Sequence, residues 1–461
     1  MEPLKYTFPD PIIEPPKISR QTCANMVFTV AIIGGGIAGL SAAIALRQLP
    51  SVDVQVYERA KEFKELGALI GLAPNGLRTL EKLGVEEVLS DEVGWRSPNG
   101  VPMCFKHFKT GDVLSIDYNH NVPDRRHQFA RMHRASLQKA LLKDLPPSIL
   151  HTSKKVSIVR TNDDGATVDF EDGTSLTADL VIGADGIKSK VRESFIKNHK
   201  LSSSGDAIFR TTFPYDLVAD LPGLEQNSTH YQSPTSWFFG TRLGSDQFGV
   251  TCSFHVDKND PFTDTTWNAP ATVDDIRKVF KDFYSPIPLI IDRIPEGTLR
   301  RYTNEAGEAL SRWTFGNRVT LIGDAAHTHG GAYAAGASLA VDDAYVLYLS
   351  LRTIIQEGVK EQEKVSATRI GEALYLYEET RRPHLERVLK EVHSGRKGQT
   401  ARFEKIREEG VPESDASFRK RLASKGDPVW LNEHDAEGQF NKIYSSSSSS
   451  QASVDEVRPK L

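Results

Sequence analysis

The spacing of apolar residues predicts buried strands of a parallel sheet at three places in the chain. Largely apolar runs occupy residues 27–33, 180–182 and 319–322, and a glycine follows each of them. Strands that are covered on both faces of a parallel sheet have such continuous runs. The first and the last run lead into segments rich in alanine and leucine, which favour helices. This alternation predicts an α/β fold.

A different pattern occupies residues 205–299 and predicts a second, antiparallel sheet. Apolar side chains at even positions from Phe248 to Val256 alternate with small or polar ones, which is typical of a half-buried strand. Residues 235–242 are its expected partner, joined to it by a turn at residues 244–246. We therefore expect an inserted β-sheet domain that binds substrate in a pocket against the first domain.

The remaining segments complete the expected domain plan. We expect a flexible N-terminal arm at residues 1–25, a first domain formed by residues 26–204 and 300–350, C-terminal helices at residues 351–435, and a disordered tail at residues 436–461. The tail assignment rests on the serine run near its start. Pro383 is expected to kink or begin a helix.

Composition and charge exclude several classes of protein. The net charge of −4 gives no sign of binding to nucleic acid. Three scattered cysteines predict neither a disulfide framework nor a metal site, so a reducing, cytoplasmic location is expected. Residues 23–46 carry no charge and are long enough to cross a bilayer. Four glycines in their middle instead predict a strand, a turn and a helix, so no membrane span is expected.

A glycine fingerprint follows the first apolar run. Gly34, Gly36 and Gly39 form G-x-G-x-x-G, and Glu58 ends the next predicted strand, 19 residues beyond Gly39. In dinucleotide-binding folds such glycines allow a tight turn, close approach to a pyrophosphate, and close packing of the helix on the strand. The acid at this spacing binds a ribose. The alternative is a structural turn with an incidental glutamate.

Two further carboxylates stand just beyond predicted strand ends. Asp324 follows Gly323 and precedes a glycine-rich turn, where a carboxylate suits a ribose or ribityl hydroxyl. Asp185 lies in an Asp-Gly turn, with Ser189 and Arg192 close behind it. Asp185 is interpreted either as a ligand contact or as a helix cap.

Together these motifs resemble those of the single-component FAD-dependent aromatic monooxygenases, and most of all the fungal salicylate-hydroxylase-like enzymes. The resemblance covers about residues 26–395. It implies a Rossmann-like FAD-binding domain of the glutathione-reductase type, with FAD as the cofactor. Only one G-x-G-x-x-G is present, so NAD(P)H would bind transiently as a co-substrate.

Carried over by position, the resemblance implies a role for each of ten residues. Arg210 would be catalytic, with a surface strand arginine as the alternative. The FAD would be bound by Gly34, Gly36, Gly39, Glu58, Gly71, Arg134, Asp185, Asp324 and Ala337. Further candidates in the pocket are His230, Tyr231, His327 and His329. Members of that family commonly have prolines where this chain has residues 328–333. The resemblance therefore does not determine the shape of the oxygenation pocket or the substrate.

The implied reaction is hydroxylation of a phenolic or salicylate-like ring by a flavin C4a-hydroperoxide formed from O2, with or without decarboxylation. The first alternative is a secondary-metabolite monooxygenase that epoxidises or dearomatises a polyketide, indole or terpenoid. The second is a non-catalytic protein that binds a flavin or NAD. The expected partners are a small aromatic substrate, O2 and NAD(P)H, and a homodimer is one candidate assembly.

Overall fold

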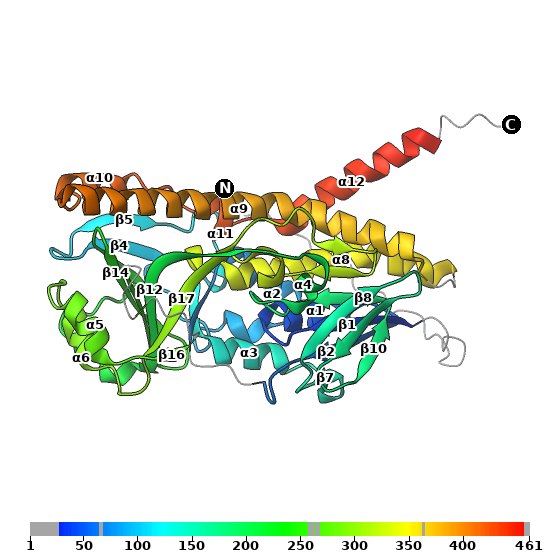
Figure 1. Cartoon of the computed structure of the whole chain (residues 1–461), viewed down its shortest axis with the longest axis horizontal. Coiled ribbons are helices and arrows are strands. Elements are labelled where there is room, and N and C mark those ends of the chain that lie inside the picture. Colours follow the sequence, from blue (N-terminus) through cyan, green and yellow to red (C-terminus); the bar gives the residue numbers. More distant parts are fainter. Residues whose placement is uncertain (1–26, 64–67, 257–261, 263–267, 362–364, 456–461) are drawn as a thin grey trace, which may run out of the picture.

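Two sheets lie side by side, and one long helix runs along both of them (Figure 1). The computed structural model describes residues 27–63, 68–256, 262, 268–361 and 365–455. The first sheet lies near the predicted nucleotide-binding fingerprint, and the second carries Arg210.

The first sheet contains the predicted buried strands. Its order is β18-β19-β11-β1-β2-β7, with β18 at Thr314–Phe315, β19 at Val319–Leu321, β11 at Leu180–Gly183, β1 at Phe28–Ile33, β2 at Val52–Tyr57 and β7 at Leu150–His151. All neighbouring pairs are parallel except β18 with β19. The apolar side chains of β1, β11 and β19 are almost fully buried, as their continuous runs predicted.

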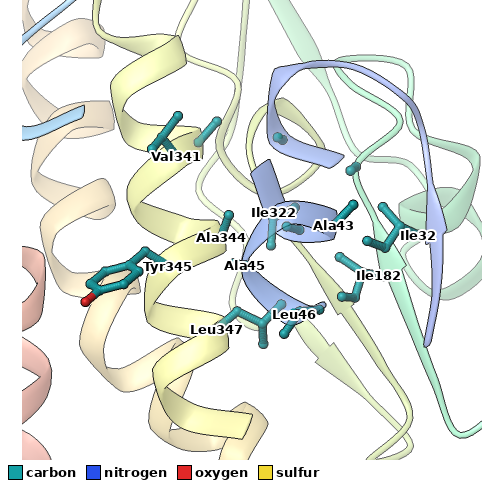
Figure 2. Packing of buried hydrophobic residues seen from close by; sticks show 14 of the residues in the cluster. Ile32, Ala43, Ala45, Leu46, Ile182, Ile322, Val341, Ala344, Tyr345 and Leu347 are labelled. Carbon is teal, nitrogen blue, oxygen red and sulfur yellow. The ribbon is translucent and has the colours of Figure 1, made fainter. Parts of the chain in front are cut away.

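Two helices with small side chains pack on this sheet in successive layers. Helix α1 spans Ile37–Leu46 and helix α8 spans Gly336–Glu361. Figure 2 shows Ala43 and Leu46 of α1 between the strands and residues Val341, Ala344 and Leu347 of α8. Alanines at the contact let the helix axes approach closely, so nearly every α1 residue is buried.

The second sheet has eight strands and is wider than the segment for which it was predicted. Its order is β16-β17-β12-β15-β14-β13-β4-β5, with β16 at Ala269–Pro270, β17 at Arg300–Gly307, β12 at Leu201–Pro214, β15 at Gln247–His255, β14 at Ser236–Leu243, β13 at Thr229–Gln232, β4 at Met103–His107 and β5 at Val113–Asp117. The predicted hairpin of β14 and β15 is present. Strands β4, β5 and β17 come from outside residues 205–299. The edges of a sheet need partner strands, and the alternation within one strand does not show which segment pairs with it.

One face of this sheet is covered by helices α5 (Val273–Phe280) and α6 (Ile287–Asp292) over a separate apolar core. That core contains Phe209, Phe238 and Phe248 from the strands. Side chains alternate along a strand, so the intervening residues, Arg210 among them, face the other way. The opposite face is therefore free to form a site.

The C-terminal helices extend beyond the range expected for them, and one of the two alternatives for Pro383 is excluded. Helix α9 spans Ala367–Glu409 and includes Pro383, which therefore does not begin a helix. The predicted disordered tail is wrong for Ala436–Asp455, which form helix α12. Its first turns bury Ala436 and Phe440, and the serine run that follows obscured this anchor in the sequence. In the described part of the chain, no helix has the length and apolar character needed to cross a membrane.

The remaining elements connect these layers. They are β3 (Leu69–Leu72), α2 (Pro74–Lys82), β6 (Ala130–His133), α3 (Arg134–Leu142), β8 (Val156–Thr161), β9 (Ala166–Phe170), β10 (Ser175–Ala178), α4 (Lys190–Phe195), α7 (Asp324–His327), α10 (Asp415–Ala423) and α11 (Val429–Asn432).

Candidate active site

The three sequence motifs leave the first sheet side by side at its carboxyl edge. The Ala184 amide donates to the Ile33 carbonyl at 2.8 Å, and the Ile322 amide donates to the Gly183 carbonyl at 3.0 Å. These bonds join the ends of β1, β11 and β19. Ligands of open α/β sheets bind outside the carboxyl ends of the strands. The fold therefore gathers the motifs where a nucleotide is expected.

The three fingerprint glycines have the different environments that their predicted roles require. Gly34 has a φ of +108°, and a Cβ there would lie 2.4 Å from the Ala184 carbonyl oxygen. A Cβ on Gly39 would lie 1.9 Å from the Gly34 carbonyl oxygen. A Cβ on Gly36 would meet no atom of the described residues within 4 Å. Open space therefore adjoins the middle glycine alone of the three.

The first turn of α1 adjoins that space. Gly36 is its N-cap and provides no side-chain hydrogen bond, while Ile37 and Ala38 are buried. Amides at the start of a helix lack partners within it and attract anions. A pyrophosphate beside Gly36 would supply acceptors for these amides. The geometry therefore fits the pyrophosphate of a dinucleotide.

Glu58 lies beside the fingerprint. Its Oε2 accepts from the Gly35 amide at 2.8 Å, and its Oε1 accepts from the Ala60 amide at 2.8 Å. The half-buried carboxylate thus sits at the end of β2, next to the turn that would hold the pyrophosphate. This position is compatible with the expected ribose contact.

Asp324 follows Gly323, whose turn contacts α1 close to the glycine fingerprint. A Cβ on the preceding Gly323 would lie 2.9 Å from the Ala38 Cβ, so the turn at Gly323 contacts the start of α1. Asp324 is exposed although Gly323 and Ala325 on either side are buried. Its carboxylate makes no hydrogen bond to the described part of the chain. It is therefore available for a hydroxyl of a ligand that reaches across from Gly36.

A buried charge network holds the Asp324 turn. The Asp343 carboxylate accepts from the Gly323 amide at 2.9 Å, from His327 Nε2 at 2.5 Å and from Arg381 Nε at 2.8 Å. Burial opposes ionisation of Asp343, but His327 and Arg381 outweigh it and lower its pKa. Sequence analysis missed Asp343 and Arg381, because nothing local distinguishes a buried ion pair from surface charges.

Asp185 is engaged within the protein. Its carboxylate accepts from Ser189 Oγ at 2.5 Å and from the Lys190 amide at 2.7 Å, at the start of α4. These contacts match the helix-cap interpretation. Arg192 donates to the carbonyl oxygens of Ala325 at 2.9 Å and Ile187 at 2.5 Å. It thereby ties α4 to the Asp324 turn.

Gly71 and Arg134 lie at a small sheet of the two strands β3 and β6, Gly71 within β3 and Arg134 just beyond the end of β6. Gly71 belongs to β3, and a Cβ there would lie 2.6 Å from Arg131 Nη1. Arg134 begins α3 directly after β6. Burial lowers the pKa of Arg210, and the charge of Arg134 acts in the same direction. Arg134 of the first domain therefore lies within electrostatic reach of Arg210 of the second sheet.

Ala337 lies in the first turn of α8, directly after the glycine-containing segment of residues 328–335. That segment has positive φ at Gly330, Gly331, Tyr333 and Ala334, between +52° and +70°. Such backbone in non-glycine residues is uncommon and concentrates at functional sites. This loop is therefore a candidate part of the site.

His329 is buried beside this loop. It is 2% exposed, and neither ring nitrogen has a hydrogen-bond partner among the residues that the structure describes. Burial lowers its pKa, so the ring is neutral at physiological pH. A neutral imidazole with two unmatched nitrogens is a candidate ligand contact, whereas His327 is committed to Asp343.

Arg210 reaches the same loop from the second sheet. A Cβ on Gly331 would lie 3.5 Å from Arg210 Nη2, and the Arg210 guanidinium lies 5.2 Å from the Tyr302 ring centroid. The predicted catalytic residue is therefore directed at the glycine turn that follows Asp324. It is not on the outer surface of the sheet.

His230 and Tyr231 occupy opposite faces of β13. The His230 ring is tilted against the rings of Trp237 and Phe105, with centroids 4.7 Å and 5.5 Å away, on the face that carries Arg210. Tyr231 is buried in the apolar core under α5, and burial raises its pKa. Tyr231 is thus removed from the site, while His230 lines it.

Comparison with known proteins bears on the family and the fold of the chain. A family model described as "FAD binding domain" matches residues 27–391. The 6-hydroxynicotinate 3-monooxygenase of Pseudomonas fluorescens is 27% identical over 342 residues, which cover 70% of this chain and 83% of that relative. Hispidin-3-hydroxylase of Neonothopanus nambi is 28% identical over 396 residues, which cover 79% and 87%. A salicylate hydroxylase substrate complex has a TM-score of 0.72 at 22% identity, and the match covers 91% of this chain and 98% of that one. This likeness confirms the expected fold class.

Proposed function

The chain belongs to the family of the FAD binding domain, and from that membership we propose that it hydroxylates an electron-rich aromatic substrate with NAD(P)H and O2. The predicted class of FAD-dependent aromatic monooxygenase is confirmed by the family match and by the monooxygenases among the relatives. The use of NAD(P)H, the phenolic substrate and the loss of CO2 are parts of the proposal.

The residues at the carboxyl edge of the first sheet would hold FAD at two ends. Gly34, Gly36 and Gly39 would receive the pyrophosphate, and Glu58 the adenosine ribose. Asp324 would bind the ribityl chain. When bound, FAD would supply the redox chemistry, namely uptake of two electrons from NAD(P)H and activation of O2. The contact of Gly323 with α1 supports this assignment, because one extended molecule can then touch both ends.

The remaining predicted cofactor contacts are also proposals. Gly71, Arg134 and Ala337 would line the flavin, and Asp185 would contribute through its turn, because its carboxylate caps α4. With one fingerprint present, we propose that NAD(P)H binds transiently. No second dinucleotide fold occurs among the described strands and helices.

One observation carries the catalytic assignment: the Arg210 guanidinium lies against Gly331. A half-buried cation at this point would stabilise a phenolate, whose ring is more easily attacked by an electrophilic oxygen than that of the neutral phenol. If the attacked carbon bears a carboxylate, the same cation holds the acid until CO2 leaves. The loop and the sheet together would exclude water from the reaction.

The test is substrate-stimulated oxidation of NAD(P)H by the FAD-loaded protein. We expect salicylate, orsellinate or a larger phenolic polyketide to stimulate oxidation and to gain one oxygen atom from O2. Arg210→Gln should lower the stimulated rate at least about 100-fold, a typical cost of one transition-state contact. Arg160→Gln, which alters an arginine on the outer strand β8, should leave it unchanged.

The alternatives give different outcomes in this experiment. A non-catalytic flavin protein would bind FAD and show no stimulation by any phenol. Stimulation by the polyketide alone would favour the secondary-metabolite oxygenase. Equal rates for wild type and Arg210→Gln would contradict the role of Arg210.

A further inference from the structure

A polar cavity of about 220 Å³ lies on the same sheet face as Arg210. Its lining includes Trp237 and Ser253 from the sheet and Arg402 and Phe403 from α9. Whole small-molecule sites usually have volumes of about 300–1,000 Å³. The cavity is therefore too small to be a complete site and suits one end of a longer chamber.

Strand register places the cavity next to the row of residues that contains Arg210. Arg210 pairs with Thr251, which pairs with Phe239 on the next strand. The adjacent row on the same face pairs Ser253 with Trp237, two residues further along each strand. Two residues of a strand span about 7 Å. The cavity thus begins one row beyond Arg210.

Helix α9 forms the wall opposite the sheet, and it lies above β12 and β17 in Figure 1. Arg396 of α9 donates to Asn304 Oδ1 at 3.1 Å, and a Cβ on Gly330 would lie near both side chains. This contact bounds the end near the glycine loop. Arg402 lies six residues further along the helix, or about 9 Å. Along α9, the cavity at Arg402 therefore lies about two turns beyond the contact at the glycine loop.

Two polar groups in the cavity have no hydrogen-bond or ion-pair partner among the described residues. Ser253 is 1% exposed and lines the cavity, and its hydroxyl makes no hydrogen bond within the described part of the chain. Arg402 makes no ion pair or hydrogen bond there either. Burial lowers its pKa, the charge of Arg421 acts in the same direction, and the charge of Glu413 opposes both.

The other charged groups in the cavity are matched. Arg421 forms an ion pair with Glu413 at 2.8 Å. The Asp206 carboxylate accepts from Gln399 Nε2 at 3.1 Å and lies 3.2 Å from His255 Nδ1. Arg402 therefore lines the cavity, as Ser253 does, with no acid in hydrogen-bond or ion-pair contact among the described residues, and the carboxylate whose charge favours its ionised form, Glu413, is paired with Arg421. An anionic group with acceptor oxygens would satisfy both.

We propose that the cavity is the far end of the substrate site, and that the substrate is an elongated aromatic anion. Its reacting ring lies in the row of Arg210, and its carboxylate or enolate binds Arg402 and Ser253. Trp237 and Phe403 stack on the apolar part between them. This inference rests on the proposed oxygenase function and names the substrate class.

The test uses two probes of equal size. One is a biphenyl with a hydroxyl at one end and a carboxylate at the other, and its partner has a carboxamide instead of the carboxylate. Binding to the FAD-loaded protein is followed by quenching of tryptophan fluorescence. Trp237→Phe identifies the part of the signal that comes from the cavity.

We expect the carboxylate probe to bind about tenfold more tightly than the carboxamide, the effect of one charge-assisted contact. Arg402→Gln should remove this preference. Arg407→Gln, an exposed position on the same helix, should preserve it. Ser253→Ala should also lower the affinity for the carboxylate probe, which is an independent check.

The outcomes separate this inference from the proposed function. Equal affinity of wild type and Arg402→Gln for the carboxylate probe would overturn the inference, even if salicylate stimulates NAD(P)H oxidation. Selective binding of the probe without any stimulated oxidation would overturn the oxygenase function, and with it the identification of the ligand as substrate.

Discussion

Replacement of Asp343 by asparagine tests the buried network that holds the Asp324 turn. Asp343 and Arg381 are both fully buried, and their charges are joined by a 2.8 Å hydrogen bond. Asparagine keeps the shape of the side chain but leaves the Arg381 cation without its counter-ion. The loss of one partner of a buried ion pair typically costs about 3–5 kcal/mol. This is a large part of the about 5–15 kcal/mol that stabilises a typical domain.

The neighbouring Asp342 is a matched control. It is 1% exposed and accepts from Asn75 Nδ2 and Thr79 Oγ1, each at 2.7 Å. Burial raises its pKa, so the neutral side chain is tolerated there. Asp342→Asn should therefore cost only about 1 kcal/mol, the value of one hydrogen bond.

Urea unfolding of the FAD-free chains at neutral pH measures both effects. We expect the free energy of unfolding to fall by about 3–5 kcal/mol for Asp343→Asn and much less for Asp342→Asn. Because the pKa of Asp343 is lowered on folding, its contribution is present above the unfolded pKa of about 3.9 and is lost as the pH falls below it. The difference in free energy of unfolding between wild type and Asp343→Asn should thus be smaller at acid pH. Equal, small losses for both variants would refute this reasoning.

Three further predictions concern the glycines, His230 and Tyr377. Gly36→Ala should fold normally but bind FAD at least about tenfold more weakly in a fluorescence titration, because its Cβ would enter the open space. Gly39→Ala should lose its thermal transition or melt far lower, because its Cβ would lie 1.9 Å from the Gly34 carbonyl oxygen; equal behaviour of the two variants would contradict the fingerprint geometry. Burial lowers the pKa of His230 to about 3, so stability should fall as the pH drops below about 6.5, where the unfolded chain gains a proton that the folded chain does not. Urea midpoints of His230→Phe should depend less on pH between 6.5 and 4 than those of the wild type. Tyr377→Phe removes a buried hydroxyl that donates to a carbonyl of β19 at 3.0 Å, and should cost about 1 kcal/mol by urea unfolding without altering the affinity for FAD.

The first domain could be predicted from the sequence because its signals are local. The apolar run before Gly34, the spacing to Gly39 and the acid at Glu58 all lie within about 30 residues, and each fixes one element of a βαβ unit. Asp324 could be placed for the same reason, since a strand end and a glycine turn flank it. Arg210 could be named only through the resemblance, because a strand arginine has no distinctive local pattern.

The rest of the site depends on contacts between distant segments. The side-chain partners of Asp343, which are His327 and Arg381, lie 16 and 38 residues away in the chain. The spacing of apolar and polar residues does not indicate such pairs. The sheet row of Arg210 depends on the register of three strands, and Arg402 reaches the same face from a helix almost 200 residues later. The serine run of α12 suggested disorder because composition ignores the buried Phe440. Tertiary packing decided each of these cases.

The most direct test of the central claim is equilibrium titration of the flavin-free protein with FAD and, separately, with FMN. The claim is that one extended molecule is held by the glycine turn at one end and by Asp324 at the other. It predicts one FAD per chain, much weaker binding of FMN, which lacks the adenosine half, and weakened FAD binding by Asp324→Ala. No uptake of FAD, or equal affinity for FAD and FMN, would contradict it.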